Sequence, residues 1–125
     1  LIFKKKSESY FRKLENEITL EVLKKKNSVI SLGGGAFLNK LIRKSAKDKS
    51  VSFWLDVEIA QLIKRLNKTK KRPLLYKKNI STTVKKIYFD REKIYSKADY
   101  RIKCSSLKTS EIVNKILKLY ENSGN

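Results

Sequence analysis

Short β-prone runs alternate with amphipathic segments along the chain, and this alternation constrains the fold more than any other feature. Five segments carry apolar residues at spacings of three and four, which predicts helices over residues 7–26, 38–47, 58–66, 81–95 and 109–120. Three shorter runs predict strands over residues 28–32, 51–55 and 99–104. Because helical segments separate the strands, we predict an α/β fold with a parallel sheet.

The composition excludes several classes of protein. At 125 residues the chain fits one domain, and 40% hydrophobic residues are enough for a modest core. The absence of histidine and the single cysteine, Cys104, exclude His-dependent acid–base catalysis, a disulfide within the chain and a multi-cysteine zinc site. No apolar run approaches the ~18 residues of a membrane span, and the opening residues do not resemble a signal peptide. We therefore expect a cytoplasmic protein.

The net charge of +19 comes mostly from lysine, because 25 of the 31 basic residues are lysines. A basic excess suggests a polyanionic partner, but lysine is also an ordinary residue of solvated surfaces. A/T-rich codons encode lysine, asparagine and isoleucine, so we interpret most of the lysines as surface background. Arginine is better suited to binding anions through two hydrogen bonds. The six arginines are Arg12, Arg43, Arg65, Arg72, Arg91 and Arg101.

Three of the four glycines form the run Gly33–Gly35, directly after the predicted strand 28–32. Glycine lets backbone approach a ligand closely, and open α/β sheets bind ligands at the carboxyl ends of their strands. A flexible turn explains the run equally well. It is not a Walker A loop, because G-x-x-x-x-G-K-[ST] occurs nowhere in the chain.

Two arginine motifs each allow a structural and a functional interpretation. Arg12 and Glu15 share a helix face, either as a surface ion pair or with Glu15 orienting Arg12 toward an anion. Arg72 precedes the only proline, Pro73, in the lysine-rich stretch 67–80, whose lack of apolar periodicity predicts a mobile loop. There Arg72 is either a solvated charge or a group that closes over an anion.

In their order along the chain, the motifs closely resemble those of shikimate kinases. The most specific are F-R-x-x-E at 11–15, S-L-G-G-G-A at 31–36 and R-P-L-L at 72–75. W-L-D at 54–56 and R-x-x-x-Y at 91–95 complete the series. The resemblance covers nearly the whole chain.

The resemblance implies a fold and an activity. Shikimate kinases are P-loop kinases with a three-layer fold, a parallel sheet with helices on both faces. We expect it here as a single domain over residues 1–125, with a lid loop at 67–80. These enzymes transfer the γ-phosphoryl group of ATP to the 3-hydroxyl of shikimate, with Mg²⁺, in aromatic amino-acid biosynthesis (the chorismate pathway). We expect shikimate and ATP as ligands, no nucleic acid or membrane as partner, and a monomer in the full-length form.

The resemblance also implies roles on the substrate side. Arg12 and Arg91 look like the arginines that grip the shikimate carboxylate, with Glu15 orienting Arg12. The glycine run looks like the loop packed against shikimate, formed by Gly33, Gly34 and Gly35.

On the nucleotide side, Arg72 looks like the lid arginine that reaches the transferring phosphate, a catalytic and ATP-binding role. Arg65 resembles the arginine that stacks on adenine. The family's P-loop, its lysine and its Mg²⁺ ligands precede the matched region, so we expect no metal ligand in this chain. We expect a fold that is incomplete at its N-terminus and an isolated chain that is inactive.

The same resemblance predicts the strand ladder. In the family, the P-loop strand lies between the strands that match residues 29–32 and 51–55. Without that central strand, residues 51–55 should pair with 99–103 only, and residues 29–32 should remain unpaired.

Two other functions are compatible with the sequence. One is a basic nucleic-acid-binding module, and the other is a different small-molecule P-loop kinase, such as a sugar-acid kinase.

Overall fold

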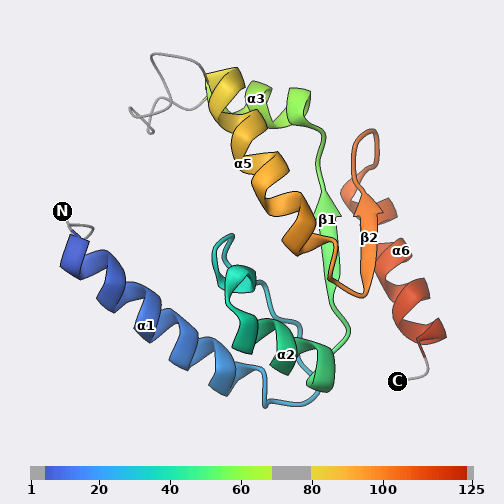
Figure 1. Ribbon diagram of the computed structural model, residues 1–125. Coiled ribbons are helices and arrows are strands. Elements are labelled where there is room, and N and C mark those ends of the chain that lie inside the picture. Colours follow the sequence, from blue (N-terminus) through green and yellow to red (C-terminus); the bar gives the residue numbers. More distant parts are fainter. Residues whose placement is uncertain (1–4, 69–79, 124–125) are drawn as a thin grey trace. The chain divides into compact units, whose positions relative to one another are not determined.

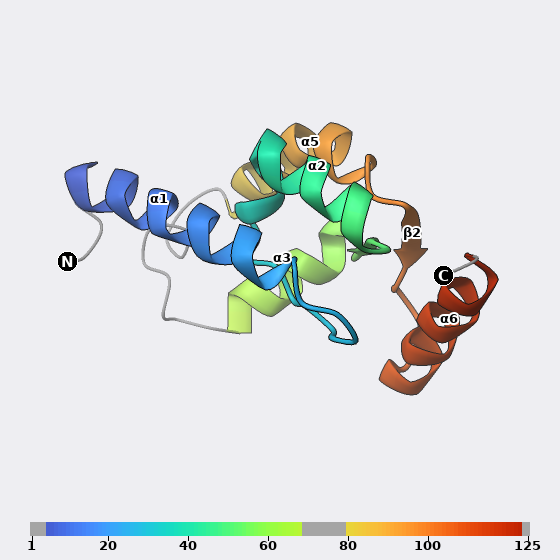
Figure 2. The same cartoon turned by 90° about the horizontal axis from the view of Figure 1, so that it is seen from below.

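The computed structural model describes residues 5–68 and 80–123, which belong to two compact units, Leu1–Ser52 and Phe53–Asn125. Figure 1 labels the helices and strands of each unit, and Figure 2 shows the same elements from below. The single domain expected over 1–125 stays a prediction, and each unit is described by itself.

The first unit consists of two helices and a short 3₁₀ turn. They are α1 (Lys5–Val22), η1 (Ala36–Leu38) and α2 (Lys40–Lys49). The helix predicted over 7–26 is confirmed as α1, which begins two residues earlier and ends four residues earlier than predicted. Asn27, with φ of 55°, turns the chain after α1, a conformation that asparagine tolerates better than most residues.

Apolar residues from both helices and from the segment between them form the core of this unit. The buried members are Leu23, Ala36, Ile42 and Ala46. Four half-buried side chains pack against them, those of Leu20, Ile30, Leu32 and Phe37. Asn39 caps α2, since its side-chain oxygen accepts hydrogen bonds from the Leu41 and Ile42 amides at 2.8 and 3.1 Å.

The predicted strand over residues 28–32 is wrong as an element, because these residues form no β-ladder. Ile30 and Leu32 pack on the core of the first unit, whereas Val29 is fully exposed. A β-prone run becomes a strand only where a second strand offers its backbone groups, and no described strand pairs with this run.

The second unit is an α/β arrangement around two parallel strands. Its elements are β1 (Phe53–Asp56), α3 (Ile59–Lys68), α5 (Ile80–Tyr95), β2 (Tyr100–Lys103) and α6 (Thr109–Asn122). Figure 1 draws α5 and α6 on opposite sides of the two strands. The predicted α/β class with a parallel sheet is confirmed.

The strand ladder also agrees with the prediction. β1 pairs in parallel with β2, from Phe53 opposite Tyr100 to Asp56 opposite Lys103. Within the described residues, β1 pairs with no other strand. This register places Trp54, Asp56 and Arg101 on one face of the ladder, because side chains alternate between the two faces.

The predicted lid over 67–80 lies mostly outside the described residues. Its ends are helical, because α3 continues to Lys68 and α5 begins at Ile80. In the described parts of the chain, no helix is long and apolar enough to cross a membrane.

Candidate functional site

The first unit brings the predicted substrate-side residues of α1 and the glycine run together. The Arg12 guanidinium donates from Nη1 to Glu15 Oε1 at 2.7 Å, one turn along α1. The Arg12 side chain stays 46% exposed, whereas that of Glu15 is only 18% exposed. The Arg12 Cζ also lies 5.5 Å from the centre of the Phe11 ring. A carboxylate thus orients a guanidinium that keeps donors free for solvent or an anion.

The glycine run lies directly against this pair. A Cβ added at Gly35 would lie 2.6 Å from Arg12 Nη1, and one at Gly33 would lie 3.3 Å from Glu15 Oε2. Gly35 has a φ of −91°, which any L-residue adopts. Space beside Arg12, and not an unusual backbone angle, therefore requires glycine at position 35. Gly34 lies between these two contacts in the chain.

Arg91 belongs to the second unit and lies on α5. Its Nη1 donates to the Tyr95 hydroxyl at 3.4 Å, one turn further along the helix. The Tyr95 ring meets Trp54 of β1 edge to face, with centroids 6.0 Å apart. Tyr95 thus links Arg91 to the strand.

A buried polar cluster beneath α5 was not predicted from the sequence. We call it the Asp56 cluster; it consists of Trp54, Asp56, Tyr88 and Arg101. Asp56 Oδ1 accepts from the Tyr88 hydroxyl at 2.8 Å, and Asp56 Oδ2 accepts from Arg101 Nε and Nη2 at 2.8 and 2.6 Å. The Arg101 guanidinium lies over Trp54, with Cζ 4.4 Å from the ring centre.

The Asp56 cluster shifts the pKa values of Tyr88 and Arg101. Burial, then the hydrogen bond and charge of Asp56, raise the pKa of Tyr88 above its ordinary value. The hydrogen bond to Asp56 raises the pKa of Arg101, against the opposing effect of burial. The only sequence signal for this cluster was an aspartate at the carboxyl end of a strand, in W-L-D.

Three further residues stand out in the sequence, namely Arg65, Arg72 and Cys104. Arg65 is an exposed residue of α3, and Arg72 lies outside the described residues. Cys104 is half-buried after β2, and burial followed by the charge of Asp56 raises the pKa of its thiol. A neutral thiol is a poor nucleophile, so a packing role suits Cys104 better than a catalytic one.

The described residues contain no cluster of potential metal ligands. No group of three or more potential ligand side chains occurs among them. Asp56, the buried carboxylate, already accepts from Tyr88 and Arg101 through its two oxygens. In phosphoryl-transfer sites, Mg²⁺ is usually held by one or two carboxylates together with water and substrate phosphates.

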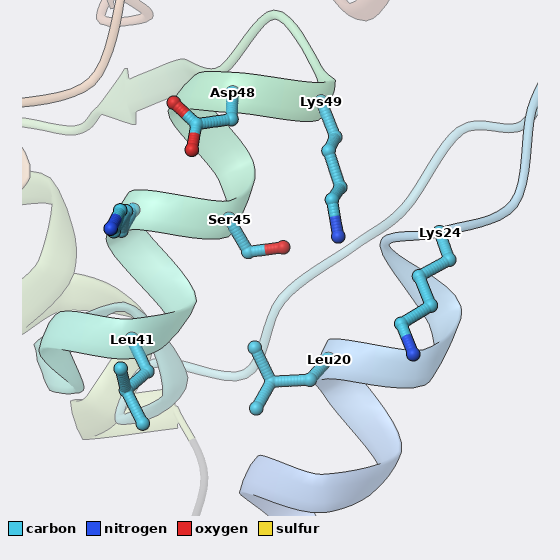
Figure 3. A pocket seen from close by; sticks show the side chains of 7 residues that line it. Leu20, Lys24, Leu41, Ser45, Asp48 and Lys49 are labelled. Carbon is cyan, nitrogen blue, oxygen red and sulfur yellow. The ribbon is translucent and has the colours of Figure 1, made fainter.

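A pocket of about 350 Å³ lies within the first unit, beside α1 and α2. Figure 3 shows the Ser45 hydroxyl and the Lys49 side chain pointing into the space between the two helices. No predicted site residue lines it. The lining residues are Leu20, Lys24, Leu41, Lys44, Ser45, Asp48 and Lys49.

Comparison with known proteins gives consistent matches. A family model described as shikimate kinase matches residues 1–121. The chain is 37% identical to the shikimate kinase of Aquifex aeolicus over 122 residues, which are 98% of this chain and 71% of that protein. It is 39% identical to the shikimate kinase of Bartonella henselae over 101 residues, 81% of this chain. The chain spans about half the length of the Bartonella henselae protein, 48%.

Solved structures agree with the sequence matches. The crystal structure of shikimate kinase from Aquifex aeolicus gives a TM-score of 0.81 at 36% identity, covering 98% of this chain and 71% of that one. Shikimate kinase from Acinetobacter baumannii in complex with shikimate gives 0.81 at 28% identity, covering 94% and 66%.

Proposed function

Because the chain belongs to the shikimate kinase family, we propose that the protein phosphorylates the 3-hydroxyl of shikimate with ATP. We place this activity in aromatic amino-acid biosynthesis in the cytoplasm and expect a monomer. The observation that carries the proposal is the contact of Arg12 with both Glu15 and Gly35. It places a half-exposed guanidinium, a group suited to binding a small carboxylate, directly against the glycine run.

In this proposal, two arginines bind the shikimate carboxylate. Arg12 offers the planar donors of a guanidinium group that Glu15 orients. Arg91 offers a second guanidinium group, which is oriented by its hydrogen bond to Tyr95. Gly33, Gly34 and Gly35 give the substrate close access to the backbone. The relative that was solved with bound shikimate supports this substrate.

On the nucleotide side, the proposal follows the family resemblance. Arg72 would stabilise the charge that develops on the transferring phosphoryl group, and Arg65 would stack on adenine. Family membership implies the use of ATP. We expect the Mg²⁺ ligands in the part of the family fold that precedes the matched region.

Titration calorimetry with shikimate tests the substrate side directly. The titrations use the full-length protein. Arg12→Lys should weaken shikimate binding about 10- to 100-fold, because a charge-assisted contact contributes ~1.5–3 kcal/mol. Lys13→Ala is the matched control, since Lys13 is the exposed neighbour on the same helix. Undetectable shikimate binding by the unmodified protein, or equal effects of the two substitutions, would contradict the proposal.

A further inference from the structure

We propose that the Asp56 cluster is a positioning device that holds Arg91 in its shikimate-binding orientation. This inference rests on the proposed function, because it assigns Arg91 to the substrate carboxylate. None of the four residues of the cluster needs to contact shikimate. They act through α5, the helix that carries Arg91.

The first step is the anchoring of α5 by the buried carboxylate of Asp56. Asp56 is 6% exposed, and its two oxygens accept three short hydrogen bonds from Tyr88 and Arg101. A buried carboxylate that loses a donor leaves an acceptor unsatisfied, which is unfavourable. The cluster therefore has one well-defined arrangement, in which Tyr88 on α5 is tied to β1 and Arg101 on β2 is tied to the same carboxylate.

The second step is the transmission along α5. Tyr88 precedes Arg91 by one helical turn and Tyr95 follows it by one turn, so the three share a helix side. The Trp54 ring contacts both tyrosine rings, with centroids 6.4 Å from Tyr88 and 6.0 Å from Tyr95. The Tyr95 hydroxyl then accepts from Arg91. A rotation of α5 would break the contacts on both sides of Arg91 together.

The third step concerns Arg101, the second arginine whose guanidinium lies near α5. Arg101 lies on the face of the ladder that Trp54 and Asp56 occupy, and it also approaches Glu92 of α5 at 3.8 Å. Its guanidinium is engaged by Asp56 and by the Trp54 face. The cluster thus restrains one arginine as a structural cation and leaves the substrate carboxylate to Arg91.

A double-mutant cycle separates positioning from general destabilisation. Tyr88→Phe removes one hydroxyl and keeps the ring against Trp54. It should raise the shikimate Kd about three- to ten-fold, the range of a single hydrogen bond, and leave the ATP Kd unchanged. In the Arg91→Lys background, the same substitution should change the shikimate Kd by less than about two-fold, because Arg91 is the residue it acts through.

The matched control is Lys86→Ala, which removes only the exposed Lys86–Asp90 ion pair of the same helix and should leave both Kd values unchanged. Arg101→Lys provides a second test, because it keeps the charge but loses one of the two donors to Asp56. It should also weaken shikimate binding alone. All titrations use the longest translated form of the protein, and a thermal melt confirms that each variant is folded.

The outcomes distinguish the two proposals. If the unmodified protein does not bind shikimate, the proposed function fails. If it binds shikimate but Tyr88→Phe and Arg101→Lys leave the Kd unchanged, or weaken binding equally in both backgrounds, the positioning role is wrong. If both variants lose shikimate affinity only while Arg91 is present, the positioning role is supported.

Discussion

At the scale of single residues, the position of the Arg12 guanidinium depends on the absence of a side chain at Gly35. The backbone at Gly35 is ordinary, so a side chain there is disfavoured only by the Arg12 guanidinium, which would lie 2.6 Å from an added Cβ. That guanidinium is the far end of a flexible side chain and can move. A substitution at Gly35 should therefore affect the direction of Arg12 more than the stability of the fold.

Gly35→Ala is expected to lower shikimate affinity about 10-fold or more, because displacing Arg12 removes a charge-assisted contact. The midpoint of thermal unfolding should change little. Gly33→Ala is the graded control, since its Cβ would lie 3.3 Å from Glu15 Oε2 and should displace less. Calorimetry and a thermal melt on both variants measure the two effects. A large loss of stability with intact affinity would contradict this explanation.

Arg91→Lys should weaken shikimate binding far more than ATP binding, because lysine keeps the charge but lacks the planar fork. The loss should be about 1.5–3 kcal/mol, as for a charge-assisted hydrogen bond. Separate titrations of the two ligands measure it. An unchanged shikimate Kd together with a raised ATP Kd would show that Arg91 serves the nucleotide.

At the scale of elements, local patterns predicted most of the fold. Both strands of the ladder and the five helices were placed within a few residues, because each has a clear apolar period. Residues 28–32 have the same local pattern but no pairing partner, which a local pattern does not reveal. Asn39 was also missed as a helix cap, because the predicted helix began at residue 38.

The residues of the candidate site were likewise predicted only in part from the sequence. Arg12, Glu15 and the glycines were identified through motifs, and the structure brings Arg12 and Glu15 against Gly33 and Gly35. The Asp56 cluster joins residues separated by 32 and 45 positions along the chain. No periodicity connects such residues, so only the strand register and the packing of α5 reveal them.

The cap of α2 gives a prediction at this scale. Asn39→Ala should lower the free energy of unfolding by about 1 kcal/mol, because the Leu41 and Ile42 amides lose their acceptor. Asn39→Ser should retain most of the stability, since serine also caps helices well. Urea unfolding of the three proteins measures the differences. An alanine variant as stable as the unmodified protein would show that the cap contributes nothing.

The Tyr88 hydroxyl gives a pH-dependent prediction. Its pKa is raised above the ordinary value of 10.0, so folding favours the neutral phenol. This contribution to stability is present below about pH 10 and is lost as the pH rises through the raised folded-state pKa. The stability difference between the unmodified protein and Tyr88→Phe should therefore be constant below about pH 10 and shrink as the pH rises above it. A difference that stays constant above about pH 10 would contradict the prediction.

At the scale of the whole molecule, the 125-residue polypeptide expressed alone should not release ADP in a shikimate-dependent manner. Its sequence contains no G-x-x-x-x-G-K-[ST] motif to position the nucleotide phosphates. A coupled ADP-release assay with and without shikimate tests this. Turnover above the shikimate-free rate would show that the polypeptide positions ATP by other means.

The parallel pairing of β1 with β2 also has a consequence for biosynthesis. Phe53 and its partner Tyr100 are 47 positions apart, so β1 leaves the ribosome well before β2 has been made. At about 5–20 residues per second, the wait is roughly 2–9 seconds. During that interval the nascent strand, with Phe53, Trp54 and Leu55, has no β2 beside it. Synonymous codons that slow translation between the two strands should therefore increase the dependence of this protein on chaperones during synthesis.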